Sequence, residues 1–167
     1  MNKIDIKQLN TSFIELISKD WALLTSGDSD NFNTMTVSWG GIGFLWNKPV
    51  AFVFVRAERY TFEYIERTGQ FTLSFLKDEF HKAHSICGSK SGRDCDKVAE
   101  AGLTPLVLDS KQVTFEQSKL VIECKSMYSD MLDAENYIDT EALNKWYGAK
   151  GGMHKMYVAE IVNTYSI

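Results

Sequence analysis

The sequence predicts a mainly β protein, in the form of a mostly antiparallel barrel that carries short helices at its edges. At least six segments have strand character, and several short helical patterns fall between them. The helices do not alternate regularly with the strands, which argues against a doubly wound parallel sheet. Neither a repeat nor a change in composition divides the 167 residues, so we expect a single domain over residues 1–167.

The first third of the chain predicts one helix and two strands. Residues 11–17 have the pattern of a short helix, for which Thr11 or Ser12 can provide the cap. Strand character follows at 21–27 and, after a polar turn, at 32–39. Side chains alternate between the two faces of a strand, so hydroxyl-bearing and aromatic side chains gather along the second of these strands.

The middle of the chain combines glycine-rich, apolar and helical stretches. The stretch GGIGF at 40–44 predicts a flexible segment whose backbone can approach another group closely. The run PVAFVFV at 49–55 is almost continuously apolar, which predicts a strand buried on both faces. A helix is expected over 61–69, with Thr61 as its cap and Gly69 as its stop.

The rest of the chain predicts three strands and three helices. Residues 91–105 begin with a Ser-x-x-Asp capping pattern and should hold a helix that ends at Gly102. The other short helices are expected at 81–87 and 139–148. The remaining strands are expected at 71–75, 120–128 and 154–166.

Composition and charge exclude several classes of protein. With 44% hydrophobic and 24% charged residues, the chain is an ordinary globular protein. Its net charge of -4 and lack of a broad basic face argue against nucleic-acid binding. No apolar run approaches the roughly 20 residues that a membrane-spanning helix needs, and the N-terminus lacks the apolar core of a signal peptide. We therefore expect a cytoplasmic protein with no membrane association.

The cysteines indicate free thiols rather than a metal site. Cys87, Cys95 and Cys124 form no C-x-x-C pair, and their number is odd. His81 and His84 lie three apart on a predicted helix, but no third ligand accompanies them, so two ordinary polar residues are favoured over a metal site. We expect no bound metal.

Two arginines before the helix at 61–69 indicate a local anion site in this acidic chain. Arg56 lies at the end of the apolar strand, and Arg59 lies in the connection to the helix. A helix start presents free N–H groups and the positive end of its dipole, and guanidinium groups suit phosphate. The alternative is that both arginines are solvated or pair with carboxylates nearby. The candidate partners are Glu58, Glu63 and Glu66.

A second stretch, CGSKSGRDCDK at 87–97, has the character of an anion-binding loop. Its small residues leave backbone N–H groups accessible, while Lys90, Arg93 and Lys97 add positive charge. It matches neither the phosphate loop of nucleoside triphosphatases nor the dinucleotide-binding fingerprint. The alternative is an ordinary polar loop that leads into a capped helix.

Four stretches together resemble a known family. NTMTVSW, PVAFVFVRAERYT, CGSKSGRDCDK and HKMYVAEI follow in the order and spacing of the flavin reductase-like FMN-binding split barrels, in particular the flavoredoxin-like branch. The resemblance covers the chain from about Trp21 to its end. It implies a six-stranded antiparallel split barrel and a homodimer with FMN bound non-covalently at the dimer interface.

The resemblance also implies roles for individual residues. In such proteins the segment matching 33–36 lies along the isoalloxazine ring, the RxxRYT match supplies phosphate contacts, and the loop after the fourth predicted strand closes over the flavin. The implied FMN contacts are Asn33, Thr34, Met35, Thr36, Ser38, Trp39, Arg56, Arg59, Tyr60, Thr61, Cys87, Gly88, Ser89, Ser91, Gly92 and Lys97. His154 matches a histidine near the nicotinamide side and is the candidate catalytic residue, although a structural histidine at a strand edge is the alternative.

The residues agree with these implied roles in chemical type. Thr34, Thr36 and Asn33 offer donors and acceptors for a pyrimidine edge. Trp39 and Met35 could provide an apolar wall, although packing in the core is the favoured alternative for both. The segment GFLWNKP replaces the SLxPP-like segment of many flavin reductases, which favours the flavoredoxin-like branch.

Three functional hypotheses follow. The first is an FMN-dependent oxidoreductase that takes hydride from NAD(P)H and passes electrons to an acceptor. The second is an FMN-binding electron carrier that exchanges electrons with a redox partner protein and does not oxidise NAD(P)H itself. The third is a thiol-based redox protein that uses Cys87 and Cys95, for which buried or idle thiols are the favoured alternative.

Overall fold

The computed structural model describes residues 1–148 and 152–166. Its main sheet has the strand order β3-β2-β6-β9-β10-β5-β4, and each of these pairs is antiparallel. β1 pairs with the C-terminal end of β10, also antiparallel. The strands of this sheet are β1 (Asn2–Ile4), β2 (Ala22–Gly27), β3 (Phe32–Val37), β4 (Gly40–Leu45), β5 (Lys48–Arg56), β6 (Gln70–Leu76), β9 (Ser118–Met131) and β10 (His154–Ser166). A separate two-stranded sheet joins β7 (Pro105–Val107) and β8 (Val113–Phe115). The prediction of a mainly antiparallel β fold is confirmed, and all six predicted strands are present.

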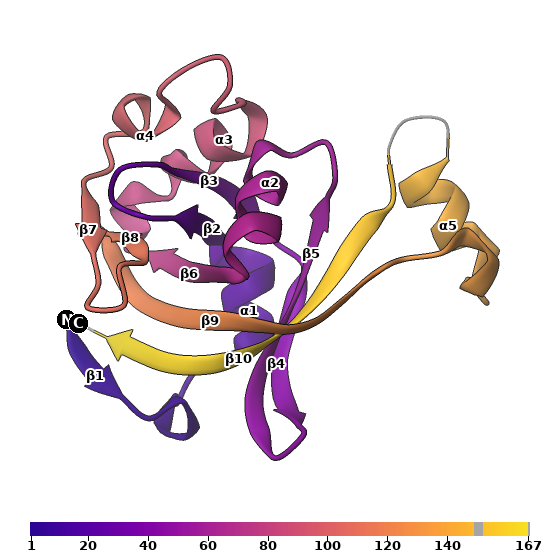
Figure 1. The fold of residues 1–167 in the computed structure, drawn as a ribbon, viewed down its shortest axis with the longest axis horizontal. Coiled ribbons are helices and arrows are strands. Elements are labelled where there is room, and N and C mark those ends of the chain that lie inside the picture. Colours follow the sequence, from indigo (N-terminus) through magenta and orange to yellow (C-terminus); the bar gives the residue numbers. More distant parts are fainter. Residues whose placement is uncertain (149–151, 167) are drawn as a thin grey trace.

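The described residues form five short α-helices, all but the last of which lie around the curved sheet (Figure 1). They are α1 (Phe13–Glu15), α2 (Tyr60–Thr68), α3 (Lys82–Ser89), α4 (Lys97–Glu100) and α5 (Thr140–Tyr147). α1 continues as a π-helical turn over Leu16–Asp20, and Ser12 caps it by accepting a hydrogen bond from the N–H of Glu15 at 3.4 Å. In the described residues no helix is both long enough and apolar enough to cross a membrane.

The main core fills the inside of the sheet. Leu24, Phe71, Ile122 and Tyr157 belong to it, and each is at most 2% exposed. A second core cluster, which includes Leu23, Leu76, Ala83, Cys87, Leu103 and Phe115, packs α3 and α4 onto the sheet. This second cluster fixes the segment between α3 and α4, which carries much of the predicted anion loop.

Two predictions for the middle of the chain are wrong. The GGIGF segment is not a flexible connection but strand β4, in which Gly40 has a φ of 154° and a Cβ there would lie 2.5 Å from the Phe52 carbonyl oxygen. Its backbone approaches β5, which explains the need for glycine. β5 is not buried on both faces, because Ala51, Val53 and Val55 face the core whereas Phe52 and Phe54 on the other face stay half-buried.

Two predicted helix starts also differ from the structure. α2 is preceded by Arg59 as its N-cap, and the Thr61 side chain is buried instead, where its hydroxyl accepts a hydrogen bond from Asn33 Nδ2 at 2.6 Å. α4 is capped by Asp96, and Ser91 lies in the loop before it. The Thr61 hydroxyl is thus used in a contact with β3, which local sequence cannot show. The predicted helix stops at Gly69 and Gly102 are confirmed, with φ values of 64° and 65°.

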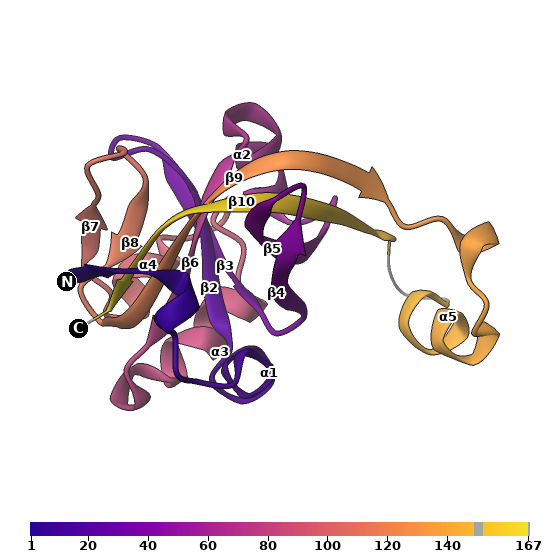
Figure 2. The same cartoon turned by 90° about the horizontal axis from the view of Figure 1, so that it is seen from below.

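β9 and β10 extend beyond the barrel as a long hairpin that carries α5 at its far end (Figures 1 and 2). β10 also pairs with β5, so that His154 lies opposite Arg56. The start of β10 therefore meets the end of β5 and the end of β3 at one edge of the sheet. This edge is where the predicted site residues gather.

Candidate functional site

A groove runs along the ends of β3, β5 and β10. Its volume is about 200 Å³. The residues that line it are Met35, Thr36, Val37, Ser38, Trp39, Phe54, Arg56, Arg59 and His154. Seven of these nine are residues that the sequence singled out, and Phe54 and Val37 are additional.

A smaller pocket lies beside this groove, at the start of α2. Its volume is about 90 Å³. The lining residues are Glu58, Arg59, Tyr60, Thr61, Ser89, Lys90, Ser91 and Lys97. We call it the anion pocket. Arg59 lines both the groove and the anion pocket, so its side chain is where the two cavities meet.

Arg59, which is half-buried, and Lys97, which is buried, place two positive charges at the anion pocket. Arg59 Nη1 donates to the Gly88 carbonyl at 2.8 Å, and Lys97 Nζ donates to the Cys87 and Lys90 carbonyls at 3.4 and 3.2 Å. Lys97 is only 3% exposed. Among the residues that the structure describes, no carboxylate lies within ion-pair distance of either side chain. The carbonyls at the end of α3 therefore hold two cations whose charge is left for an anion to balance.

Burial shifts the pKa values of both cations. It lowers the pKa of Lys97 to about 8, and it lowers the pKa of Arg59 from its usual value. The neighbouring Arg59 charge adds to the effect on Lys97. An anion in the pocket would oppose both shifts, since an opposite charge nearby favours the protonated form.

Arg56 does not join Arg59 in the anion pocket. It lies 3.7 Å from the Glu58 carboxylate, donates to the Trp146 carbonyl at 3.1 Å, and lies over the Tyr147 ring at 5.6 Å. For Arg56 the alternative of carboxylate pairing therefore holds. It lines the opposite part of the groove, whereas Lys97, thirty-eight residues from Arg59 in sequence, takes the second place at the anion pocket.

The β3 residues divide into those that line the groove and those that do not. Met35, Thr36, Ser38 and Trp39 line it, and Thr36 Oγ1 also donates to the His84 carbonyl on α3 at 2.7 Å. Thr34 is fully buried, and its hydroxyl is bonded to Thr25 at 2.9 Å, so its side chain lies outside the groove.

Asn33 and the segment after α3 are packed against each other. A Cβ on Gly92 would lie 2.1 Å from Asn33 Oδ1, and one on Gly88 would lie 3.4 Å from Thr36 Cβ. The glycines thus let this segment approach β3 closely. Ser89 and Ser91 line the anion pocket, but the Cys87 side chain belongs to the second core cluster and only its carbonyl takes part.

His154 closes the far end of the groove inside an aromatic cluster. Its Nδ1 lies 2.8 Å from the Tyr147 hydroxyl, and its ring lies 5.3 Å from that of Trp39. Trp39 in turn contacts Trp146 edge-on at 4.9 Å. Burial, with help from the Arg56 charge, lowers the pKa of His154 to about 4, so the imidazole is neutral at pH 7.

Sequence reasoning missed Trp146 and Tyr147 as site residues. Both lie on α5, in a helix that was correctly predicted but far from the other motifs in sequence. Adjacent aromatic residues at a helix end are a weak signal, because such residues often pack in the core. Only the pairing of β10 with β5 brings them to the groove.

The cysteines and histidines support neither thiol nor metal chemistry. All three cysteines are free. Burial raises the pKa of Cys87 to about 11, and it also raises the pKa values of Cys95 and Cys124. Each thiol is therefore a poor nucleophile at neutral pH. Within residues 1–148 and 152–166, no cluster of three potential metal ligands is present.

Comparison with protein families gives one match. The family model described as "Flavin reductase like domain" matches residues 15–166. No curated protein matches the chain.

Comparison with solved structures shows the fold. Flavoredoxin from Methanosarcina acetivorans is 21% identical with a TM-score of 0.68, over 100% of this chain and 76% of that one. A putative flavin reductase with a split barrel domain from Shewanella frigidimarina is 22% identical with a TM-score of 0.68, over 98% and 75%. An NADH:FAD oxidoreductase from Streptomyces globisporus, in complex with NAD and FAD fragments, is 13% identical with a TM-score of 0.64, over 89% and 74%. The prediction of a split barrel is thus confirmed, but the implied number of six strands is too small, since the main sheet has eight strands in the described residues.

Proposed function

The chain belongs to the family of flavin reductase like domains, and from that membership we propose that it binds FMN non-covalently and acts as an oxidoreductase. In this proposal NAD(P)H delivers hydride to the flavin, and the electrons pass on to an acceptor. FMN-binding and flavin-reducing relatives of this fold support the proposal by analogy.

The position of Arg59 is the observation that carries the proposal. FMN has a phosphate dianion at one end and a tricyclic ring at the other, so its site needs a cationic pocket joined to a larger groove. Here Arg59 lines both the anion pocket and the groove, and Lys97 adds a second charge. Phosphate oxygens could accept hydrogen bonds from the guanidinium and from the free N–H groups at the start of α2.

The groove has the chemical character that the flavin ring requires. Hydroxyl groups of Thr36 and Ser38 lie along β3, and Trp39 and Phe54 offer flat apolar surfaces. The donors, the apolar wall and the unpaired cations together fit FMN. Met35, whose side chain is 6% exposed, contributes mainly to the core beneath the groove.

When bound, FMN would supply the two-electron chemistry, which no side chain of this protein can provide. The protein would bind and orient the ring, and the aromatic cluster around His154 would keep water from one end of the groove. Burial raises the pKa of Tyr147 to about 12, so its hydroxyl stays protonated and can hold the neutral His154 ring in place. We propose His154 as the residue that helps to position the nicotinamide.

The cofactor proposal is tested first by the purified protein itself. A yellow protein that releases FMN on denaturation, or an apoprotein that quenches FMN fluorescence on titration, would support it. No flavin in the preparation and no binding of added FMN would overturn it.

The activity is tested by anaerobic oxidation of NADH and NADPH with FMN bound. Rapid nicotinamide oxidation supports the reductase. Slow or absent oxidation with flavin still bound would instead support the second hypothesis, an FMN-binding electron carrier that works with a protein partner.

We also propose that the chain forms a homodimer with the flavin near the dimer interface. The β9–β10 hairpin and α5 extend from the barrel (Figure 2) and leave large apolar side chains exposed. These include Tyr128, Met131, Ile138 and Trp146. Light scattering coupled to size-exclusion chromatography tests the proposal, and a monomeric mass at micromolar concentration would contradict it.

A further inference from the structure

The segment between α3 and α4, residues 90–96, lies over the anion pocket, and we call it the capping loop. Lys90 and Ser91 line one side of the pocket, whereas Glu58, Tyr60 and Thr61 line the other. One side chain of the capping loop, Arg93, reaches across to that other side. Sequence reasoning assigned Arg93 no role beyond adding positive charge.

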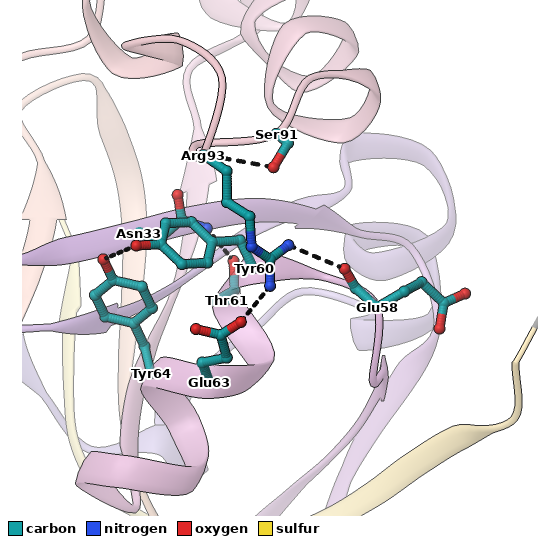
Figure 3. A network of polar contacts seen from close by, with 8 residues as sticks. All are labelled: Asn33, Glu58, Tyr60, Thr61, Glu63, Tyr64, Ser91 and Arg93. Carbon is teal, nitrogen blue, oxygen red and sulfur yellow. Dashed lines mark hydrogen bonds and ion pairs between the residues drawn. The ribbon is translucent and has the colours of Figure 1, made fainter.

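Arg93 makes three contacts with the start of α2 (Figure 3). Nη1 donates to the Glu58 carbonyl at 3.3 Å, Nη2 is paired with the Glu63 carboxylate, and the guanidinium lies 4.5 Å from the centre of the Tyr60 ring. The Arg93 backbone N–H also donates a hydrogen bond to Ser91 Oγ at 3.2 Å. Arg93 therefore fastens the middle of the capping loop to the first turn of α2.

The capping loop is also held at two other places. Gly92 packs against Asn33 on β3, whose Nδ2 donates to Thr61 Oγ1 at 2.6 Å. The Lys90 carbonyl accepts from Lys97 Nζ at 3.2 Å, and Lys90 Nζ is paired with Glu100 on α4. Arg93 is the charged side chain that crosses from the capping loop to α2, so loss of its contacts would leave the loop held by β3 and α4.

The contacts of Arg93 are of a kind that can open and close. The Arg93 and Glu63 side chains are 42% and 58% exposed, and exposed ion pairs stabilise only weakly and are screened by salt. The contact with Tyr60 adds a modest cation–π attraction. Contacts of this strength hold the capping loop closed without preventing a ligand from entering.

The closed pocket has room for one phosphate group. Its volume of about 90 Å³ is well below the roughly 300 Å³ or more of cavities that hold drug-sized ligands. A second phosphate and a nucleoside would have to lie outside the pocket, and Arg93 crosses the side of it between the capping loop and α2. For this reason we expect closure of the capping loop to favour a mononucleotide over a dinucleotide.

We propose that Arg93 is a positioning and specificity-determining residue, which latches the capping loop over the phosphate of a flavin mononucleotide and so slows its release and disfavours FAD. This inference rests on the proposed function, because it takes FMN as the occupant of the anion pocket. Arg93 acts on the ligand through the loop, by way of Glu63 and Tyr60.

The test compares the wild type with Arg93→Gln, Glu63→Gln and the double variant, each with FMN, FAD and riboflavin. Stopped-flow fluorescence should show FMN leaving roughly 3- to 30-fold faster from Arg93→Gln and up to about fivefold faster from Glu63→Gln, which removes the ion pair alone. The double variant should release FMN no faster than the faster of the two single variants, because both substitutions break the same contact between Arg93 and Glu63. FAD affinity should be unchanged or tighter, so the ratio of FMN to FAD affinity falls.

Arg67→Gln is the matched control. Arg67 lies on α2, as Glu63 does, and its guanidinium lies 4.8 Å from the Tyr64 ring, much as that of Arg93 lies over Tyr60. It is in the last turn of the helix and outside the anion pocket. FMN release from this variant should match that of the wild type. Amide hydrogen exchange over residues 90–96 of the flavin-free protein should become faster in Arg93→Gln and Glu63→Gln and stay unchanged in Arg67→Gln.

The outcomes separate this inference from the proposed function. If the wild type binds FMN but both Arg93→Gln and Glu63→Gln leave FMN release and the ratio of FMN to FAD affinity unchanged, the latch is overturned. The cofactor proposal is then left intact. An equal loss of affinity for all three flavins also overturns the latch, since that indicates general damage to the site. Wild type that binds no flavin overturns the proposed function and the ligand selectivity together, and the exchange measurement still decides whether Arg93 holds the capping loop.

Discussion

Arg59 and Lys97 are the residues at which burial and charge are in conflict. Removing a cation from water without a counter-ion costs of order several kcal/mol, and both side chains are held only by main-chain carbonyls at the end of α3. Many exposed positions nearby could have held these charges at lower cost. The free energy of holding the two cations there becomes favourable when a dianion enters the anion pocket. Anion binding therefore best explains the position of these side chains.

Replacing Arg59 by alanine should weaken FMN binding about ten- to a hundredfold. A charge-assisted hydrogen bond contributes roughly 1.5–3 kcal/mol, and Arg59 also shapes the pocket through its bond to the Gly88 carbonyl. Fluorescence titration of the apoprotein measures the change. Arg67→Ala, in the last turn of the same helix, should leave the affinity nearly unchanged. Equal affinities for wild type and Arg59→Ala would contradict a phosphate role for this residue.

Lys97 should make FMN affinity depend on pH. With its pKa lowered to about 8, the ammonium is charged below that pH, and a phosphate dianion binds without proton uptake. Above it, the neutral amine must gain a proton on binding, so the dissociation constant should rise by up to tenfold per pH unit. Titrations between pH 6.5 and 9.5 would show the rise, and Lys97→Met should bind more weakly but with a flat profile. A flat profile in the wild type would argue against Lys97 at the phosphate.

At the scale of elements, the capping loop and α2 are joined through close backbone approach as well as through side chains. Gly92 lies against Asn33, and Asn33 is bonded to Thr61 in the first turn of α2. A displacement of the capping loop is therefore passed to the helix start, which offers its N–H groups to the anion pocket. The shape of the pocket depends on the fit between these two elements.

Gly92→Ala should disturb this fit. The added methyl group would lie 2.1 Å from Asn33 Oδ1, so either Asn33 loses its bond to Thr61 or the capping loop moves outward. We expect FMN binding to weaken by more than tenfold, while the midpoint of thermal unfolding changes by only a few degrees, since the capping loop contributes no residue to the main core. Gly41→Ala on β4, where a Cβ meets nothing within 4 Å, is the control. Unchanged binding in Gly92→Ala would show that the loop packs less tightly than described.

At the scale of the whole molecule, two buried histidines connect folding to pH. His84 lies on α3 and packs against Trp21, with a buried Nδ1 that has no partner in the described residues, and His154 lies in the groove. Burial lowers the pKa of each to about 4. Both imidazoles therefore remain neutral in the folded chain over a pH range in which they would be protonated in the unfolded chain.

Stability should accordingly fall as the pH decreases from about 6.5 toward 4. The unfolded chain binds more protons in this range, so the stabilisation from both histidines is present above pH 6.5 and is lost as the pH approaches their folded-state pKa values. Urea unfolding at pH 7.5 and 5.0 measures the loss. The double variant His84→Gln, His154→Gln should lose less over the same interval. Asp78 cannot explain the effect, because a hydrogen bond from Lys119 lowers its pKa below this range. Equal midpoints at the two pH values would contradict the assignment.

The sequence by itself determined six of the strands and the helix stops, whereas β1, β4, β7 and β8 were not predicted and the type of site remains a prediction. Strand character depends on alternation and on β-branched and aromatic residues within short windows, and Gly69 and Gly102 end helices through a local backbone preference. Arg59 at the start of α2 could be recognised for the same reason, because a helix start and a preceding arginine are neighbours in sequence.

Only the tertiary structure decided which residues meet. Lys97 rather than Arg56 accompanies Arg59, Thr34 is buried while Thr36 lines the groove, and Arg93 crosses to Glu63. Trp146 and Tyr147 reach the groove through the β9–β10 hairpin. Each of these contacts joins residues far apart in sequence, and their geometry depends on strand register and helix packing, which local propensity and spacing do not specify.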